Sequence, residues 1–247
     1  FSGYTTTAIL EMRTLPTYDN GVQMTAQTVE YICHSGSDLL VVNSARVSFS
    51  KESKEFNDKD EKLINFLARE KHLLPFRHPS LTLRCKAPMF VARQLGKHQT
   101  GMSWSEESRR YIKTEPEFYW PDKWRKAADN VKQGSSDEPH DMVILYGTGG
   151  KNGLTHLEDC GKEIVEEVLS LYNTLIKEGV APEQARMILP QNVMINWVWT
   201  GTLLAWVHLI KERTSPTAQR ETKEFAKMVE KIVREHYPIS AGALMNE

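Results

Sequence analysis

Short apolar runs and one alternating segment mark the first hundred residues of the chain. Residues 29–34 (VEYICH) and 39–42 (LLVV) are rich in β-branched and apolar side chains, which favours two short strands. In residues 81–85 the apolar positions alternate with Thr82 and Arg84, a pattern typical of a half-buried strand. Pro88 can then start a helix over residues 89–95.

Residues 57–71 carry a different period. Asn57 is followed by acidic residues and then by Leu63, Ile64 and Leu67 at helical spacing. An asparagine side chain can accept from the free N–H groups of a first turn, so this pattern predicts a helix capped by Asn57 that ends near Lys71.

The second half of the chain is dominated by helical patterns. The apolar positions of 159–178 follow i, i+3, i+4, i+7, and Gly179 stands where a helix commonly ends. A short helix is expected in PEQARMIL before Pro190, and a final amphipathic helix over 218–235. The apolar and aromatic run 193–210 predicts a buried helix interrupted near Thr200 to Thr202.

Turn-forming residues cluster in the segment 129–153, where GSSDEPHD and GTGGKNG flank MVILY. We expect a loop-rich excursion there and not a domain boundary. At 247 residues the chain is long enough to bury a sizeable core. Length alone allows one large domain or two small ones.

Composition narrows the classes of function. The formal net charge is −1 and the pI about 6.8, so no overall positive field indicates nucleic-acid binding. The three cysteines are far apart and lack the spacing of zinc ligands, which indicates a reducing compartment and no metal site. No apolar run approaches the roughly 18 residues that span a bilayer, and the first residues do not resemble a signal peptide. We therefore expect a cytoplasmic protein without membrane contact.

The densest chemistry lies in residues 93–111 (RQLGKHQTGMSWSEESRRY). Cationic side chains, short hydroxyls and backbone N–H groups after a helix are what an anion such as phosphate requires. A charge cluster is more often a solvated surface. Met102 and Trp104 among the charges, and Tyr111 after two consecutive arginines, favour a binding site.

Three segments in this order resemble the flavin-dependent thymidylate synthases, the ThyX family: residues 76–111, 183–190 (EQARMILP) and 208–221 (HLIKERTSPTAQRE). The resemblance covers about residues 63–226 and fails in the loop 129–153. It implies a single α+β domain of the ThyX type over residues 1–247, with a mixed or antiparallel sheet and several long helices. The resemblance also implies a homotetramer with active sites shared between subunits.

The family signature is an RHR triplet followed, after seven residues, by SxR. In this chain Lys97, His98 and Gln99 occupy the triplet, and eight residues separate Gln99 from Ser108. Lysine keeps a positive charge without the bidentate fork of arginine, and glutamine keeps hydrogen bonding without charge. We expect an altered contact with the flavin and not its loss.

The resemblance also implies the reaction and its residues. The family methylates dUMP at uracil C5 with methylenetetrahydrofolate as carbon donor, FAD as hydride carrier and NADPH as reductant. Arg213 matches the arginine that meets the pyrimidine, and His72 a histidine near the folate and flavin entrance; His78 is expected to be structural. The residues implied for dUMP binding are Gln94, Lys97, Glu106, Glu107, Ser108, Arg109, Arg110, Arg186 and Arg213. Those implied for FAD binding are Leu74, Lys97, His98, Gln99, Glu106, Thr202, Leu204 and His208.

Isolated residues of these sets have plainer interpretations. Arg186 could be an exposed helix charge, Arg213 a cation that complements a helix dipole, and His208 a core histidine. Cysteine-dependent thymidylate synthesis is disfavoured because Cys33 and Cys85 lie in apolar strand patterns and Cys160 at a helix start. Two alternatives stay open: hydroxymethylation of a deoxypyrimidine monophosphate, and a non-catalytic nucleotide-binding relative without flavin.

Overall fold

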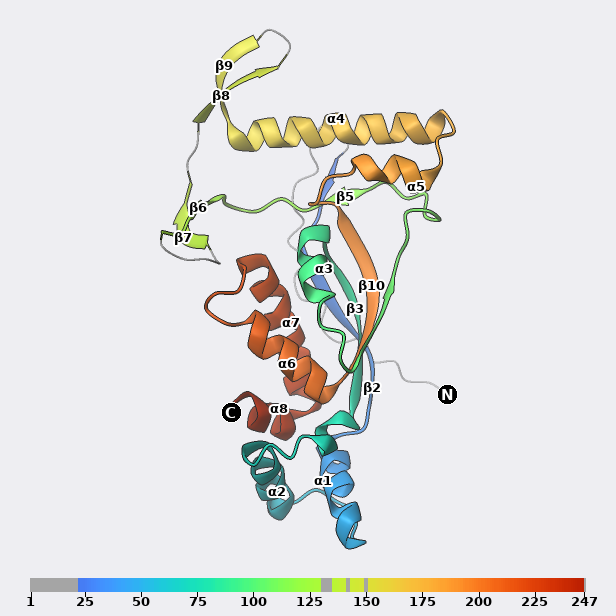
Figure 1. Ribbon diagram of the computed structural model, residues 1–247, viewed down its shortest axis with the longest axis vertical. Coiled ribbons are helices and arrows are strands. Elements are labelled where there is room, and N and C mark those ends of the chain that lie inside the picture. Colours follow the sequence, from blue (N-terminus) through green and yellow to red (C-terminus); the bar gives the residue numbers. More distant parts are fainter. Residues whose placement is uncertain (1–21, 130–134, 141–142, 149–150, 247) are drawn as a thin grey trace.

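The computed structural model describes residues 22–129, 135–140, 143–148 and 151–246. Its centre is a four-stranded antiparallel sheet in the order β2-β3-β10-β4 (Figure 1). The strands of this sheet are β2 (Thr28–Ser35), β3 (Ser80–Pro88), β10 (Met194–Thr202) and β4 (Met102–Glu106). Sheet and surrounding helices together confirm the α+β class.

In the view of Figure 1, helices lie along one side of this sheet and beyond both of its ends. In chain order they are α1 (Asp38–Arg46), α2 (Asp58–Arg69), α3 (Met89–Leu95), α4 (Leu157–Lys177), α5 (Pro182–Ala185), α6 (Leu203–Arg213), α7 (Arg220–His236) and α8 (Pro238–Met245). Short 3-10 helices add η1 (Val47–Phe49), η2 (Leu74–Arg77) and η3 (Arg186–Ile188). Among the described residues, no helix combines the length and the apolar character that crossing a membrane requires.

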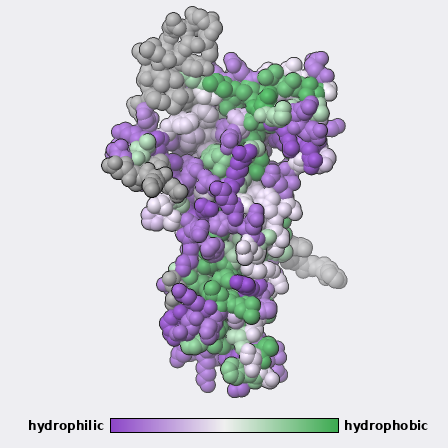
Figure 2. All heavy atoms as spheres, in the orientation of Figure 1, coloured by the Kyte–Doolittle hydropathy of each residue, from purple (hydrophilic) through white to green (hydrophobic). Residues whose placement is uncertain are grey.

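Two apolar clusters hold the elements together. The larger one joins the sheet to α1, α2, α3, α6, α7 and α8, and the smaller one joins α4 to β1 (Gln23–Met24) and β5 (Glu117–Phe118). Strands β1 and β5 pair in parallel. Along α4, at the top of Figures 1 and 2, apolar surface stays uncovered, including Ile164 and Leu171, about half exposed.

The segment 193–210 is a strand followed by a helix, so the prediction of one buried helix was wrong. β10 pairs with β3 on one side and with β4 on the other, and its buried residues Trp197, Trp199 and Gly201 alternate with half-buried ones. A central strand with neighbours on both edges suits aromatic and β-branched residues. Thr202 then begins α6, because its Oγ1 accepts from Ala205 N at 3.2 Å.

The predicted strand at 39–42 is also wrong, since these residues belong to α1. Val41 and Val42 are buried together with Asp38, which is helical spacing. The Asp38 carboxylate accepts from the backbone N–H groups of Ile239 and Ser240 at 3.0 and 2.9 Å, at the start of α8. This contact between residues far apart in the sequence outweighs the local preference of the valines for a strand.

The expected loop at 129–153 contains strands on its described residues. β6 (Arg125–Ala127) pairs with β7 (Ser135–Pro139), and β8 (Val143–Thr148) pairs with β9 (Lys151–His156). Val143 to Tyr146 of MVILY contribute to β8. Most of GSSDEPHD forms β7, and the KNG of GTGGKNG begins β9, so residues typical of turns lie within strands here. Residues 1–21, 130–134, 141–142 and 149–150 lie outside the described part of the chain.

The remaining helix and strand predictions are confirmed for 29–34, 57–71, 81–85, 89–95, 159–178, the short helix after Ala181, and 218–235, with ends shifted by a few residues. At α2 the predicted cap is complete. Asn57 Oδ1 accepts from Lys59 N at 3.0 Å, and Asp60 Oδ2 accepts from Asn57 N at 2.9 Å. Helix α8, which no pattern predicted, follows Pro238 directly after α7.

Replacing Asn57 by alanine should lower the free energy of unfolding by about 1 kcal/mol, because the first turn of α2 loses its side-chain acceptor. Thermal or urea unfolding monitored by circular dichroism measures this change. Asn65→Ala in the same helix is the matched control, since Asn65 is exposed and no cap depends on it. Equal effects of the two substitutions would contradict the capping role.

Candidate active site

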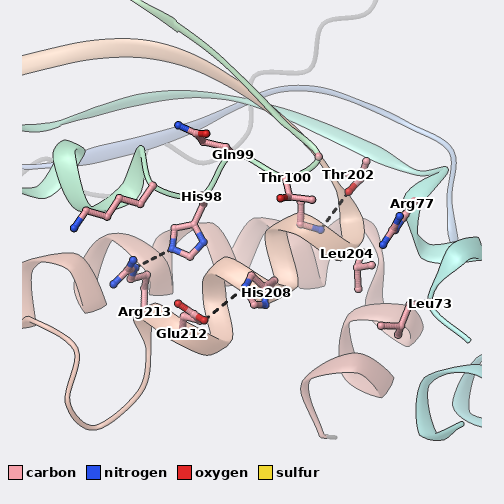
Figure 3. Close-up of a pocket in the computed structure, with 13 residues that line it drawn as sticks. Leu73, Arg77, His98, Gln99, Thr100, Thr202, Leu204, His208, Glu212 and Arg213 are labelled. Atoms are coloured by element: carbon pink, nitrogen blue, oxygen red, sulfur yellow. Dashed lines mark hydrogen bonds and ion pairs between the residues drawn. The ribbon is translucent and has the colours of Figure 1, made fainter. Parts of the chain in front are cut away.

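The turn between α3 and β4 runs alongside α6, from Arg213 at the end of the helix to Thr202 at its start, and forms the centre of the site (Figure 3). Gly101 makes this crossing possible. Its φ is 73°, and a Cβ there would lie 3.0 Å from Thr202 Oγ1 and 3.3 Å from Ala205 Cβ. A side chain would therefore both strain the backbone and push the turn away from α6.

A cavity of about 540 Å³ opens beside this turn. Its residues come from η2 and the residue before it, from the turn, from the end of β10 and from α6: Leu73, Arg77, Lys97, His98, Gln99, Thr100, Gly101, Thr202, Leu204, Ala205, His208, Glu212 and Arg213. Leucine and alanine side chains make an apolar wall, while cations and amide or hydroxyl groups line the rest. Below it is called the flavin-side cavity, because it contains most of the residues that the resemblance implies for FAD binding.

Arg213 and His98 are joined directly, as the dashed line in Figure 3 marks. Arg213 Nε donates to His98 Nε2 at 2.9 Å, so this imidazole nitrogen is an acceptor and His98 is neutral. Burial lowers the pKa of His98, and the guanidinium of Arg213 lowers it further; His208 acts in the same direction, against Glu212. The histidine therefore holds the arginine and stays uncharged near neutral pH.

Of the two terminal nitrogens of Arg213, one is hydrogen-bonded to the described part of the chain and the other is not. Nη2 donates to the backbone carbonyl of Gln94 at 3.4 Å, while Nη1 has no hydrogen-bond partner within the described residues. Two fixed contacts on one edge thus leave the remaining donors of the guanidinium for a ligand.

His208 and Glu212 lie one turn apart on α6, with Nε2 and Oε1 3.6 Å apart and more than half of each side chain exposed. Their ligand atoms and those of His98 fall within 4.8 Å of one another, which could hold a metal ion. However, His98 Nε2 is occupied by Arg213, and a guanidinium beside the group opposes a cation. The arrangement is better suited to an anionic or polar ligand.

A second, more polar cavity of about 650 Å³ shares Lys97, Glu212 and Arg213 with the first. Its other residues come from the end of α3 and the loop after α6: Gln94, Ser215, Thr217, Ala218 and Gln219. It is called the polar cavity below. Its hydroxyls, amides and two cations are suited to a nucleotide. The polar cavity and the flavin-side cavity meet at Arg213, which lines both.

A third cavity, of about 780 Å³, lies on the opposite side of the same turn. Lys97, His98 and Gln99 line it together with Trp104 and Glu106, whose carboxylate accepts from Trp104 Nε1 at 3.2 Å. Lys97 therefore borders all three cavities.

The SxR segment, Ser108 to Arg110, lies outside the three cavities. Glu107 Oε2 accepts from Asn196 Nδ2 at 2.7 Å, at the edge of the sheet. Ser108 Oγ accepts from Arg110 Nε at 3.2 Å, and Arg109 donates to the carbonyl of Thr114 at 2.9 Å. Glu107, Ser108, Arg109 and Arg110 line none of the three cavities.

Arg186 is exposed in η3, an element that packs against α4. The SxR segment leads to the same helix, since Glu115 Oε1 accepts from Asn173 Nδ2 at 3.0 Å. Like that segment, Arg186 lines none of the three cavities. One chain therefore brings Gln94, Lys97 and Arg213 together, but not these further candidates for dUMP binding.

His72 and Leu74 lie at the margin of the flavin-side cavity. Both are exposed, and the His72 ring stands edge-on to Phe66 with 6.0 Å between centroids. Their neighbours Leu73 and Arg77 line the cavity instead. Thr202 and Leu204 both line the flavin-side cavity, and Thr202 also caps α6.

Several lining residues were absent from the sequence-based sets. Arg77, Thr100 and Gly101 lie within the segment 76–111 that carried the resemblance, but no motif position marks them. Glu212 could have been found as the residue four positions after His208 on a helix. Gln219 stands in AQRE, where its amide meets Gln94 only in the folded chain.

The chain is similar in sequence to proteins of a known family. Residues 29–239 match the family described as "Thymidylate synthase complementing protein". The flavin-dependent thymidylate synthase of Thermus thermophilus is 34% identical over 230 residues, which cover 93% of this chain and 77% of that protein. The enzyme of the same name from Thermotoga neapolitana is 32% identical, covering 91% and 90%.

The chain is also similar to a solved structure. The UMP/dUMP methylase PolB from Streptomyces cacaoi, bound with 5-Br dUMP, superposes with a TM-score of 0.71 and 28% identity. The superposition covers 91% of this chain and 97% of that one. By the family match and by relatives of over 30% identity along most of its length, this chain belongs to the flavin-dependent thymidylate synthase family.

Proposed function

We propose that the protein methylates dUMP to dTMP, with FAD in the flavin-side cavity, methylenetetrahydrofolate as carbon donor and NADPH as reductant. The observation that carries the proposal is the position of Arg213, which borders the flavin-side and polar cavities and is fixed by His98. A residue that orients the pyrimidine against the flavin has to lie where the cavity for the nucleotide meets the cavity for the flavin.

The flavin-side cavity fits FAD in the chemistry of its walls. Leu73, Leu204 and Ala205 offer an apolar surface for a flat ring system. Arg77, Lys97 and Thr100 offer donors for a pyrophosphate, and the bare backbone at Gly101 allows close approach. When bound, the reduced flavin supplies a hydride. Lys97 and Gln99 in place of arginines leave one cation fewer in the triplet.

In the polar cavity, the chain's own residues would orient the pyrimidine. The free Nη1 of Arg213 can donate to a uracil carbonyl, which makes C6 more electrophilic. Ser215, Thr217 and the amide of Gln94 supply neutral hydrogen bonds around the nucleotide. Neutral His98 keeps the guanidinium in place without adding a second charge.

A thiolate route is disfavoured. Cys85 is fully buried in β3, and burial raises the pKa of its thiol far above the usual range. Cys33, on β2, and Cys160, on α4, line none of the three cavities.

The phosphate of dUMP needs more cations than the polar cavity supplies. We propose that Ser108, Arg110 and Arg186 of one subunit complete the polar cavity of another in a homotetramer. Their exposure or partial exposure and their absence from the lining of the three cavities support this arrangement, as does the uncovered apolar surface of α4. A cytoplasmic location is part of the same proposal, since these substrates are intracellular metabolites.

Incubating the protein with dUMP, methylenetetrahydrofolate, FAD and NADPH should release dTMP, detected by mass spectrometry. Omitting any one component should abolish the product. A hydroxymethylated nucleotide would instead support the alternative reaction that the altered triplet keeps open. A flavin-bound protein that forms no new nucleotide would contradict both reactions.

Replacing Arg213 by lysine should lower kcat/KM for dUMP roughly tenfold to a hundredfold, because lysine cannot hold His98 and the Gln94 carbonyl while also donating to the pyrimidine. This corresponds to about 1.5–3 kcal/mol for a lost hydrogen bond to a charged group. Arg220→Lys is the control, since Arg220 is exposed and pairs with Glu224. Steady-state kinetics that leave R213K equal to the control would exclude the assigned role.

Affinity for dUMP should fall as the pH drops below the ordinary histidine pKa of about 6.5. The pKa of His98 is lowered, so the ring is neutral above that range and gains a proton only below it. A protonated Nε2 would face Arg213 Nε with two donors and two positive charges. Calorimetric titration between about pH 5 and 8 measures the effect. H98Q keeps an acceptor that does not titrate, so its profile should be flatter; parallel profiles would disprove the assignment.

A further inference from the structure

Glu221, at the start of α7, is a buried carboxylate held from two sides. It is 5% exposed, and Arg125 donates to it through Nη1 at 2.9 Å and through Nη2 at 3.2 Å. Gln219 Nε2 donates to Oε2 at 2.9 Å. Burial by itself raises the pKa of Glu221, but the hydrogen bonds from Arg125 and Gln219 outweigh it and lower that pKa. Glu221 is therefore ionised at neutral pH and can only accept hydrogen bonds.

This carboxylate determines which way two amides point. Because Gln219 must present its NH₂ group to Glu221, its Oε1 is directed to Gln94 and accepts from Gln94 Nε2. The Gln94 Oε1 is thereby left to accept from Thr222 Oγ1 at 3.2 Å. The negative charge thus orders the donors and acceptors of both side chains.

The ordered amides belong to the polar cavity, whereas the carboxylate does not. Gln94 and Gln219 line that cavity beside Arg213, and the Gln94 carbonyl also accepts from Arg213 Nη2. Glu221 and Arg125 lie behind Gln219, bordering a separate aromatic cavity that includes Trp120 and Trp124. The buried ion pair reaches the site only through Gln219 and Gln94.

We propose that Glu221, held by Arg125, is a positioning residue for the nucleotide: through Gln219 it fixes the amide of Gln94 that meets dUMP. The proposal rests on the proposed function. It explains why a buried ion pair stands next to a binding cavity that it does not line, since a neutral residue could not impose one orientation on both amides.

Glu221→Gln tests this directly. An amide at this position must turn an N–H group either toward Arg125 Nη1 or toward Arg125 Nη2 and Gln219 Nε2, all of which are donors. Where the N–H group faces Gln219, rotation of Gln219 relieves the clash and reverses the group presented to Gln94. Where it faces Arg125 Nη1, Gln219 keeps an acceptor but loses the charge that holds its orientation. We expect the dissociation constant and the KM for dUMP to rise about tenfold, as for one lost hydrogen bond to a ligand, with flavin absorbance and kcat nearly unchanged.

The double variant with Gln94→Ala separates positioning from general structure. If Glu221 acts through Gln94, Q94A alone should weaken dUMP binding, and adding E221Q should weaken it no further. E221D, which keeps the charge, should recover part of the affinity. Glu224→Gln is the matched control, because Glu224 lies on the same helix in an exposed ion pair with Arg220.

Three results would overturn the inference: unchanged dUMP affinity in E221Q, unchanged affinity in Q94A, or an undiminished effect of E221Q in the Q94A background. A lowered melting temperature with unchanged affinity would likewise assign Glu221 to stability alone. Failure of the proposed function shows differently, as a wild-type protein that forms no dTMP. Calorimetric binding of dUMP still tests the positioning role in that case.

Discussion

The pairing of β10 on both of its edges is the constraint on which the site depends. Its registers with β3 and β4 end at Gly201 and Thr202, so the strand delivers the chain to a fixed point where Thr202 caps α6. Trp199 and Trp206 pack edge to face at 5.0 Å across this junction and are both fully buried. Truncating either ring would cost about 3–5 kcal/mol, so the start of α6 has little freedom to shift.

From that junction α6 sets the positions of the charged groups. Leu203, Trp206 and Leu209 face the core, and the opposite side of the helix presents His208, Glu212 and Arg213 to the turn after α3. Gly101 allows the turn to come close, and His98 then meets Arg213. Burial lowers the pKa of His98 and the nearby guanidinium lowers it further, so this histidine is neutral where it meets Arg213.

Cations are divided between two regions of the chain. Lys97 and Arg213 border the cavities, while Arg110 and Arg186 are exposed and line none of the three. A dianionic phosphate is better matched by both groups than by either alone. The proposal that a second copy of the chain completes the site rests on this electrostatic argument. Buried Arg125 and Glu221 add a fixed charge pair that orders the amides beside Arg213.

Much of the fold follows from local patterns. The cap at Asn57, the alternation in 81–85 and the apolar stripe of 159–178 are properties of neighbouring residues, so the sequence was sufficient to predict α2, β3 and α4. The ordered motifs likewise indicated the family and the candidate residues. Apolar runs without a clear period were different: 39–42 became helical through Asp38 and α8, and 193–202 became a strand through its two neighbours.

Which residues meet in the site depends on the fold as well. Arg213 and His98 are 115 positions apart and hydrogen-bonded, whereas Ser108 and Arg110, much nearer to His98 in sequence, line none of its cavities. The physical reason is that strand β4 carries the chain away from the turn, while β10 and α6 bring a distant segment back to it.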